Sequence, residues 1–229
     1  MPRTRIKICG ITTVEAAQTA AAAGADAVGL MFAEGSPRTI DMAQAQRIAA
    51  ALPAFVEPVG VFLNQSIDFV RDVAARLPLR TVQLHGHETP TEAAALAPLR
   101  VIKALSFDDG LDAALAPWRG CANLAALMFD APPPERATLT GGHGTAFDWD
   151  ALAALKQRGA LDELPPIVLA GGLTPDNVAE AIATVQPYGV DVSSGVESAR
   201  GVKDPGKIVA FCEAARGARS GPSLRSGPA

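Results

Sequence analysis

The sequence of 229 residues lacks several features that define large classes of proteins. Its three cysteines, Cys9, Cys121 and Cys212, are far apart and form no CxxC pair. This pattern excludes a disulfide framework, argues against a zinc site and favours a reducing cytoplasm. The formal net charge is −4, so the basic character of nucleic-acid-binding proteins is missing. No apolar run approaches the roughly 18 residues of a membrane span, and we expect neither nucleic acid nor a membrane as a partner.

Two further absences bear on location and fold. Residues 1–5 lead directly into a strand-like pattern without a long apolar segment, so no secretory signal is expected. No Gly-x-Gly-x-x-Gly fingerprint follows the first predicted strand, which argues against a dinucleotide-binding open sheet. Hydrophobic residues make up 48% of the chain, enough for a large core in one α/β domain.

Short β-type runs alternate with longer helical patterns along the chain. The runs are 6–9, 27–32, 58–62, 81–84, 100–104, 125–130, 167–170 and 189–193, and the helical segments are 14–23, 42–52, 67–77, 91–97, 110–116, 150–157, 176–185 and 205–215. Thr174 and Pro175 are predicted as N-cap and first residue of the seventh helix. This alternation predicts parallel strands in an α/β fold, and we favour a closed (β/α)8 (TIM) barrel over an open doubly wound sheet. The barrel domain is predicted over residues 1–216, and the Gly-, Ser- and Pro-rich segment 217–229 is predicted to be a disordered tail.

Polar and small residues follow the predicted strands, and in a barrel the carboxyl ends of the strands form the catalytic face. These residues are Cys9, Gln83, His85, Lys103, Asp130, Gly171, Gly172, Asp191, Ser193, Ser194 and Gly195. A thiol, carboxylates and backbone donors together suit proton transfer on an anionic small molecule. Singly, Cys9 could be a structural buried thiol and Asp130 a loop-anchoring carboxylate instead of a general acid. Lys7 is expected to point away from Cys9 and receives no role.

Two features are typical of anion binding. Glycines at Gly171-Gly172 and Ser194-Gly195 would let backbone N–H groups approach a phosphate, with 194–196 starting a short helix. Arg38 could clamp a substrate carboxylate through two hydrogen bonds, or it could be a solvated loop residue.

The three histidines give weaker signals. His85 and His87 lie next to Glu88, but no matching ligand motif follows, so we predict no metal. His143 lies in a glycine-rich loop that we expect to close over the site.

Eleven segments, read together, resemble the phosphoribosylanthranilate isomerase family. They are KICGI at 7–11, GADAVG at 24–29, SPR at 36–38, GVF at 60–62, VQLHG at 82–86, VIKA at 101–104, FD at 129–130, FDW at 147–149, LAGGL at 169–173, NV at 177–178 and VDVSSGVE at 190–197. The resemblance covers nearly the whole chain. Two departures are His143, where the family usually has a small hydroxyl residue, and the tail after about Gly217, which has no counterpart.

The resemblance implies a (β/α)8 isomerase of tryptophan biosynthesis that performs an Amadori rearrangement without a cofactor. Cys9 would be the general base, Asp130 the general acid and Arg38 the partner of the anthranilate carboxylate. The backbone around Gly171-Gly172 and Ser194-Gly195 would hold the phosphate, and Gln83, His85, Asp191 and Ser193 would line the pocket. The expected partner is a phosphorylated aminosugar, and the protein would be a monomer or homodimer.

Two alternatives stay open at this point. A ribulose-phosphate 3-epimerase would use metal-bound proton transfer between aspartates, for which the ligand set is unconvincing. A non-catalytic sugar-phosphate-binding barrel would need neither Cys9 nor Asp130.

Overall fold

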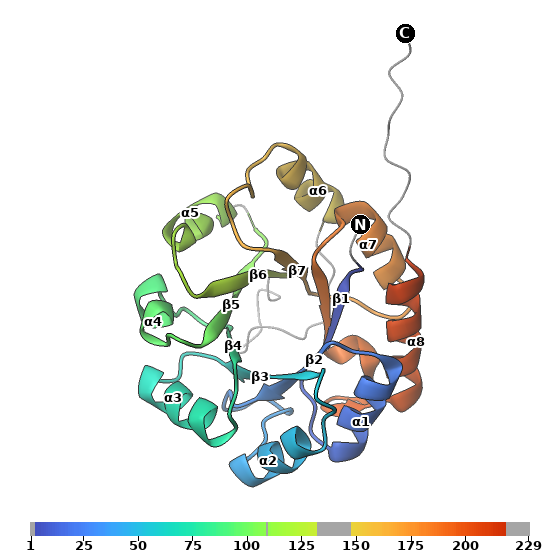
Figure 1. Ribbon diagram of the computed structural model, residues 1–229. Helices are drawn as coiled ribbons and strands as arrows, with labels where there is room; N and C mark the ends of the chain where they lie inside the picture. The colour runs from blue at the N-terminus through green and yellow to red at the C-terminus, as the bar shows by residue number, and fades with distance from the viewer. Residues whose placement is uncertain (1–2, 109, 132–147, 219–229) are drawn as a thin grey trace.

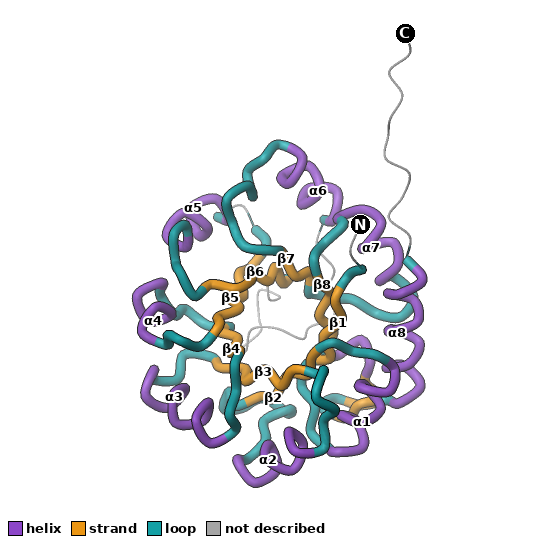
Figure 2. Tube along the Cα trace, viewed as in Figure 1, coloured by secondary structure: helices purple, strands orange, loops and turns teal. Residues whose placement is uncertain are grey.

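The computed structural model describes residues 3–108, 110–131 and 148–218. Parallel strands close into a barrel in chain order, from β1 around to β8, and helices surround it (Figures 1 and 2). The strands are β1 (Arg5–Ile8), β2 (Ala27–Met31), β3 (Glu57–Phe62), β4 (Thr81–Leu84), β5 (Arg100–Ser106), β6 (Leu124–Asp130), β7 (Ile167–Leu169) and β8 (Gly189–Val192). The closed barrel confirms the predicted fold and rules out the open sheet.

The helices lie outside the barrel and follow their strands as predicted. They are α1 (Val14–Ala23), α2 (Met42–Ala50), α3 (Ile67–Arg76), α4 (Pro90–Ala95), α5 (Leu111–Leu115), α6 (Trp149–Gln157), α7 (Val178–Val185) and α8 (Pro205–Gly217), with 3₁₀ turns η1 (Ala116–Trp118) and η2 (Ser194–Val196). A short antiparallel hairpin, β9 (Glu197–Ala199) and β10 (Val202–Lys203), follows β8 and was not predicted. Residues 219–229, most of the predicted tail, lie outside the described ranges.

Side-chain caps explain where several helices begin. The side chains of Thr13, Asp41 and Ser66 each accept a hydrogen bond from the backbone N–H three residues later. The predicted cap of the seventh helix was wrong, because α7 begins after Asn177 and not after Thr174. The Asn177 side chain accepts from the Thr174 N–H at 2.8 Å and donates to the Gly172 carbonyl at 3.0 Å. These bonds stabilise residues 172–177 as a turn that precedes the helix.

The strands have two different faces. Residues such as Ile6, Ile8 and Val190 face outward and join the large core between the barrel and the helices. The barrel interior holds a second, smaller cluster of Ala104, Ala126, Met128, Val168 and Ala170, packed against Ile102. Most of these interior side chains are small, so the barrel also has room for the buried polar residues described below.

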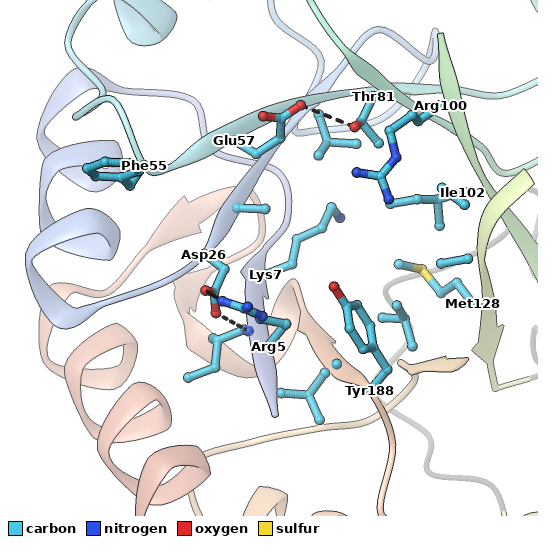
Figure 3. Close-up of a pocket in the computed structure, with 18 residues that line it drawn as sticks. Arg5, Lys7, Asp26, Phe55, Glu57, Thr81, Arg100, Ile102, Met128 and Tyr188 are labelled. Carbon is cyan, nitrogen blue, oxygen red and sulfur yellow. Dashed lines mark hydrogen bonds and ion pairs between the residues drawn. The ribbon is translucent and has the colours of Figure 1, made fainter. Parts of the chain in front are cut away.

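A cavity of about 270 Å³ opens at the amino-terminal end of the barrel (Figure 3). Arg5, Arg100 and Tyr188 lie around its mouth, and Lys7 reaches into it from β1. Phe55 lies at the rim and is 98% exposed. This end is opposite the predicted site, and in barrel enzymes residues at the amino-terminal end of the strands contribute to stability and not to catalysis. In the described ranges, no helix has the length and apolarity needed to cross a membrane.

Candidate active site

The predicted site residues gather at the carboxyl ends of the barrel strands. Cys9 directly follows β1, Asp130 ends β6, and Gly171-Gly172 follow β7. Because all eight strands are parallel and closed into one barrel, these ends meet at one mouth.

Lys103 is an exception, since its side chain lies on the outer face of β5. Its ammonium donates to Glu88 Oε2 at 2.8 Å and to the Gly86 carbonyl at 2.6 Å. It also lies 5.7 Å from the centre of the Trp118 ring, in the layer between barrel and helices. The expectation that Lys103 belongs to the site was wrong.

Cys9 is buried beside a charged pair. Its Sγ and Lys7 Nζ lie on the same side of Gly29, and Lys7 Nζ lies 2.7 Å from Asp191 Oδ1. The expectation that Lys7 points away from Cys9 was wrong, because residues two apart on a strand share a face. Lys7 and Asp191 are also direct partners in the register of β1 and β8. The three side chains therefore form one buried group.

The surroundings of this group set its protonation. Burial raises the pKa of the Cys9 thiol, and the charges of Lys7 and Lys203 oppose that rise without cancelling it, while Asp191 adds to it. Burial alone would lower the pKa of Lys7, but Asp191 and Cys9 outweigh it and the pKa is raised. At neutral pH the resting site therefore holds a thiol beside an ammonium–carboxylate pair.

Gly29 on β2 provides the space for this group. A Cβ atom at this position would lie 2.7 Å from Cys9 Sγ and 3.2 Å from Lys7 Nζ. Both distances are shorter than ordinary contacts, so any larger residue would displace the thiol or the ammonium.

Asp130 lies at the end of a row of polar side chains that runs from β4 to β6. Gln83 Nε2 lies 2.9 Å from His85 Nδ1, and His85 Nε2 lies 3.3 Å from Asp130 Oδ2. When the Gln83 amide donates to Nδ1, the proton of neutral His85 is on Nε2 and faces the carboxyl group. Asp130 Oδ1 also accepts from the Ala131 N–H at 2.9 Å. His85 thus contacts Asp130 directly, and Gln83 contacts His85.

Arg38 is buried and not a solvated loop residue. Its Nε and Nη2 donate to the two carboxylate oxygens of Glu197 at 2.7 Å and 3.0 Å. Glu197 also accepts from Lys203 Nζ at 2.9 Å, and that ammonium donates to the Ser193 carbonyl at 2.8 Å. Burial would raise the pKa of Glu197, but its bonds to Arg38 and Lys203 lower it to about 2. This ionic group connects the loop that carries Arg38 to the loop after β8.

Sequence reasoning missed Glu197 and Lys203. Glu197 lies within the VDVSSGVE segment, but the sequence gives no link to Arg38, which lies 159 residues earlier. The sequence did contain a signal for the hairpin. Gly201 suggests a turn, and the opposite charges of Glu197 and Lys203 on its two sides suggest that these residues pair across it.

The loops after β7 and β8 pack against each other. Gly171 and Gly172 have φ values of 80° and 66°, which favour glycine. A Cβ at Gly195 would lie 1.9 Å from the Leu173 carbonyl oxygen, so glycine is required for the contact. The predicted short helix exists as η2, a 3₁₀ turn whose N-cap residue Ser193 makes no side-chain cap. Glycine at these positions therefore permits the backbone turn after β7 and the close packing of the two loops.

The possible metal ligands point to different partners. His85 contacts Asp130, whereas Glu88 pairs with Lys103 and the His87 backbone N–H bonds to Asn64. Where the structure describes the chain, no three side chains of His, Cys, Asp or Glu converge on a metal position. His143 and its loop lie in 132–147, outside the described residues.

The family follows from comparison with known proteins. The model of the family described as N-(5'-phosphoribosyl)anthranilate (PRA) isomerase matches residues 6–214. The chain belongs to the phosphoribosylanthranilate isomerase family. This membership confirms the resemblance and the prediction of an isomerase enzyme.

The sequences and structures of individual relatives match this chain over most of its length. N-(5'-phosphoribosyl)anthranilate isomerase of Geotalea daltonii is 47% identical over 215 residues, covering 93% of this chain and 97% of that protein. The solved phosphoribosylanthranilate isomerase of Thermotoga maritima has a TM-score of 0.83 and 40% identity, covering 93% and 99% of the two chains. A phosphoribosylanthranilate isomerase solved in complex with reduced 1-(o-carboxyphenylamino)-1-deoxyribulose 5-phosphate has a TM-score of 0.79 and 38% identity, with the same coverage.

Proposed function

We propose that the protein converts N-(5-phosphoribosyl)anthranilate to 1-(2-carboxyphenylamino)-1-deoxy-D-ribulose 5-phosphate in tryptophan biosynthesis, with Asp130 as general acid and Cys9 as general base. The observation that carries this proposal is the position of both groups at the carboxyl ends of strands in one closed barrel, with Cys9 beside the Lys7–Asp191 pair and Asp130 beside His85. Family membership supports the substrate, and so does the related structure that holds a reduced form of the product.

The reaction needs two proton transfers to different atoms. Protonated Asp130 gives its proton to the ring oxygen, and the bond from C1 to that oxygen breaks to leave a protonated imine. The imine acidifies the C2–H bond, and the Cys9 thiolate removes that proton. Before the C2 proton is removed, the Cys9 thiol passes its own proton to the carboxylate that ring opening has left at Asp130, so that removal of the C2 proton restores both groups. A proton then moves from the C2 hydroxyl to C1 to form the ketone. No cofactor takes part in these steps.

The thiol must lose its proton although burial raises its pKa. The positive charge of the imine develops next to the sulfur during the reaction, and an opposite charge at short range favours the thiolate. The base is thus formed when the substrate is bound and its ring has opened.

The two ends of the substrate would be held by separate anion sites. Arg38 uses Nε and Nη2 for Glu197, and no described residue accepts from its Nη1, which we assign to the anthranilate carboxylate. We assign the phosphate to the backbone of Gly171-Gly172 and Ser194-Gly195, where paired loops expose N–H groups. Asp191, Ser193, Gln83 and His85 line the space between the two sites.

Turnover tests the function directly. Phosphoribosylanthranilate is generated in situ, and loss of its anthranilate fluorescence is followed with and without the protein. We expect rapid loss only with the protein, and an unchanged rate after treatment with a chelator. A loss of activity that a divalent ion restores would favour the epimerase alternative. Tight binding of the substrate without turnover would favour the non-catalytic barrel.

Oligomeric state and location remain predictions. We expect a monomer or homodimer in a cytoplasmic setting, and light scattering of the purified chain gives its molar mass. A larger assembly would contradict this expectation.

A further inference from the structure

We propose that Lys7, held by Asp191, is a positioning residue for Cys9 and that the base of the reaction is this buried group of three and not an isolated thiol. The inference depends on the proposed function only for the role of Cys9 as base. It assigns to Lys7 a function in the same site: to orient the sulfur and to stabilise its charge once the proton has left.

The arrangement of three strands fixes the contact. Lys7 on β1 and Asp191 on β8 are register partners, and Lys7 Nζ lies 2.7 Å from Asp191 Oδ1. Both side chains are almost fully buried, with 7% and 8% of their surface exposed. On the other side, Gly29 of β2 leaves space in which Cys9 Sγ and Lys7 Nζ lie together. Lys7 therefore contacts Asp191 on one side and lies beside Cys9 on the other.

A buried lysine at this position is costly for stability alone. Removing a charge from water costs several kcal/mol, and a buried ion pair is often no more stable than apolar residues of similar volume. The interior cluster around Met128 is apolar, so a methionine at position 7 would suit the packing. A charge at this place therefore points to a function for the charge.

The other groups near Cys9 do not replace Lys7. Lys203 acts on the sulfur from β10, but its ammonium is already bonded to Glu197 and the Ser193 carbonyl. Arg38 packs against Gly10, the residue after Cys9, and its guanidinium is bonded to Glu197. Asp191 carries the opposite charge and opposes loss of the thiol proton, while it keeps Lys7 protonated. Lys7 is the cation whose Nζ lies with Cys9 Sγ in the space beside Gly29.

The pH dependence of Cys9 alkylation tests this assignment without any substrate. The full chain is treated with iodoacetamide over a range of pH, and modification is measured on tryptic peptides. Residues 8–38, 120–136 and 208–216 contain one cysteine each, so Cys9 is resolved from Cys121 and Cys212. In Lys7→Met, where the peptide is 6–38, we expect the midpoint of Cys9 alkylation to rise by about one pH unit or more, because a buried opposite charge is lost. Lys7→Arg, which keeps the charge, restores most of this shift.

Two further variants make the result decisive. Lys156→Met removes a positive charge from α6, far from the sulfur, and leaves the midpoint unchanged. Asp191→Asn removes the negative charge and lowers the midpoint, which provides a reading if Lys7→Met does not fold. A midpoint that is the same in Lys7→Met and wild type, or one that Asp191→Asn raises, would overturn the proposal. If the wild-type chain were inactive and its Cys9 midpoint still depended on Lys7, the proposed function would be overturned. The assignment of Lys7 as the residue that stabilises the Cys9 thiolate would still hold.

Discussion

Gly29→Ala is the smallest change that tests how tightly the site is packed around Cys9. The added Cβ would lie 2.7 Å from Cys9 Sγ, 3.0 Å from Cys9 Cα and 3.2 Å from Lys7 Nζ. Ordinary contacts between such atoms are about 3.5–4.0 Å, so the sulfur must move by roughly 1 Å. A displacement of this size at a catalytic atom costs about 10²-fold in rate, and overpacking costs about 1–3 kcal/mol of stability.

The assay compares kcat, KM and the free energy of urea unfolding in Gly29→Ala and wild type. Gly189→Ala is the matched control, because it adds the same atom to β8, where the nearest atom is the Arg5 carbonyl oxygen at 3.3 Å. We expect kcat to fall about 100-fold in Gly29→Ala and to stay within about threefold of wild type in Gly189→Ala. A Gly29→Ala enzyme with wild-type kcat would refute the claim that the sulfur must lie where the structure places it.

Three other predictions follow from the buried polar groups. The pKa of Glu197 is about 2 against an ordinary value of 4.5, so its ionised form stabilises the fold above pH 4.5 and this contribution is lost as the pH falls toward 2. The full contribution is about 3 kcal/mol. Urea unfolding measures how much the free energy of unfolding decreases from pH 6 to pH 3, and this decrease should be about 2 kcal/mol larger in wild type than in Glu197→Gln. His85→Ala removes the ring nitrogen that lies 3.3 Å from Asp130 Oδ2, so kcat should fall roughly 10- to 100-fold with little change in KM. An unchanged kcat would show that His85 does not assist Asp130. Lys103→Met leaves Glu88 buried without its partner and should cost about 3–5 kcal/mol in unfolding while kcat of the folded enzyme stays near wild type.

The barrel could be predicted from the sequence because local signals agree with the fold. Each strand is a short apolar run, and caps such as Thr13, Asp41 and Ser66 mark the helix starts. The bounds of each of the helices α1 to α8 differ from the predicted bounds by two residues or fewer at both ends. The cap of α7 was misplaced because Asn177 forms its bonds to Thr174 and Gly172, and a residue pattern does not show which of two polar residues makes the bond.

The site was predicted in part, and the two wrong assignments, Lys7 and Lys103, have one cause. Cys9, Asp130 and the two glycine loops could be placed at the carboxyl ends of the strands, because strand ends and glycine pairs are visible in the sequence. Lys7 and Lys103 were assigned to the wrong faces, because alternation was not followed along each strand: Ile6 and Ile8 face outward, so Lys7 and Cys9 both face inward. Contacts between distant segments, such as Arg38 with Glu197, depend on the closed barrel and could not be read from local pattern.

The central claim is that a thiol and a carboxyl group at one barrel mouth transfer the two protons. The most direct measurement is turnover of Cys9→Ser and Asp130→Asn together with their affinity for an unreactive product analogue. The account predicts that each variant loses at least about 10²-fold in kcat while the analogue binds nearly as tightly as to wild type. Wild-type turnover in either variant would remove that residue from the reaction, and the proposed mechanism would be wrong.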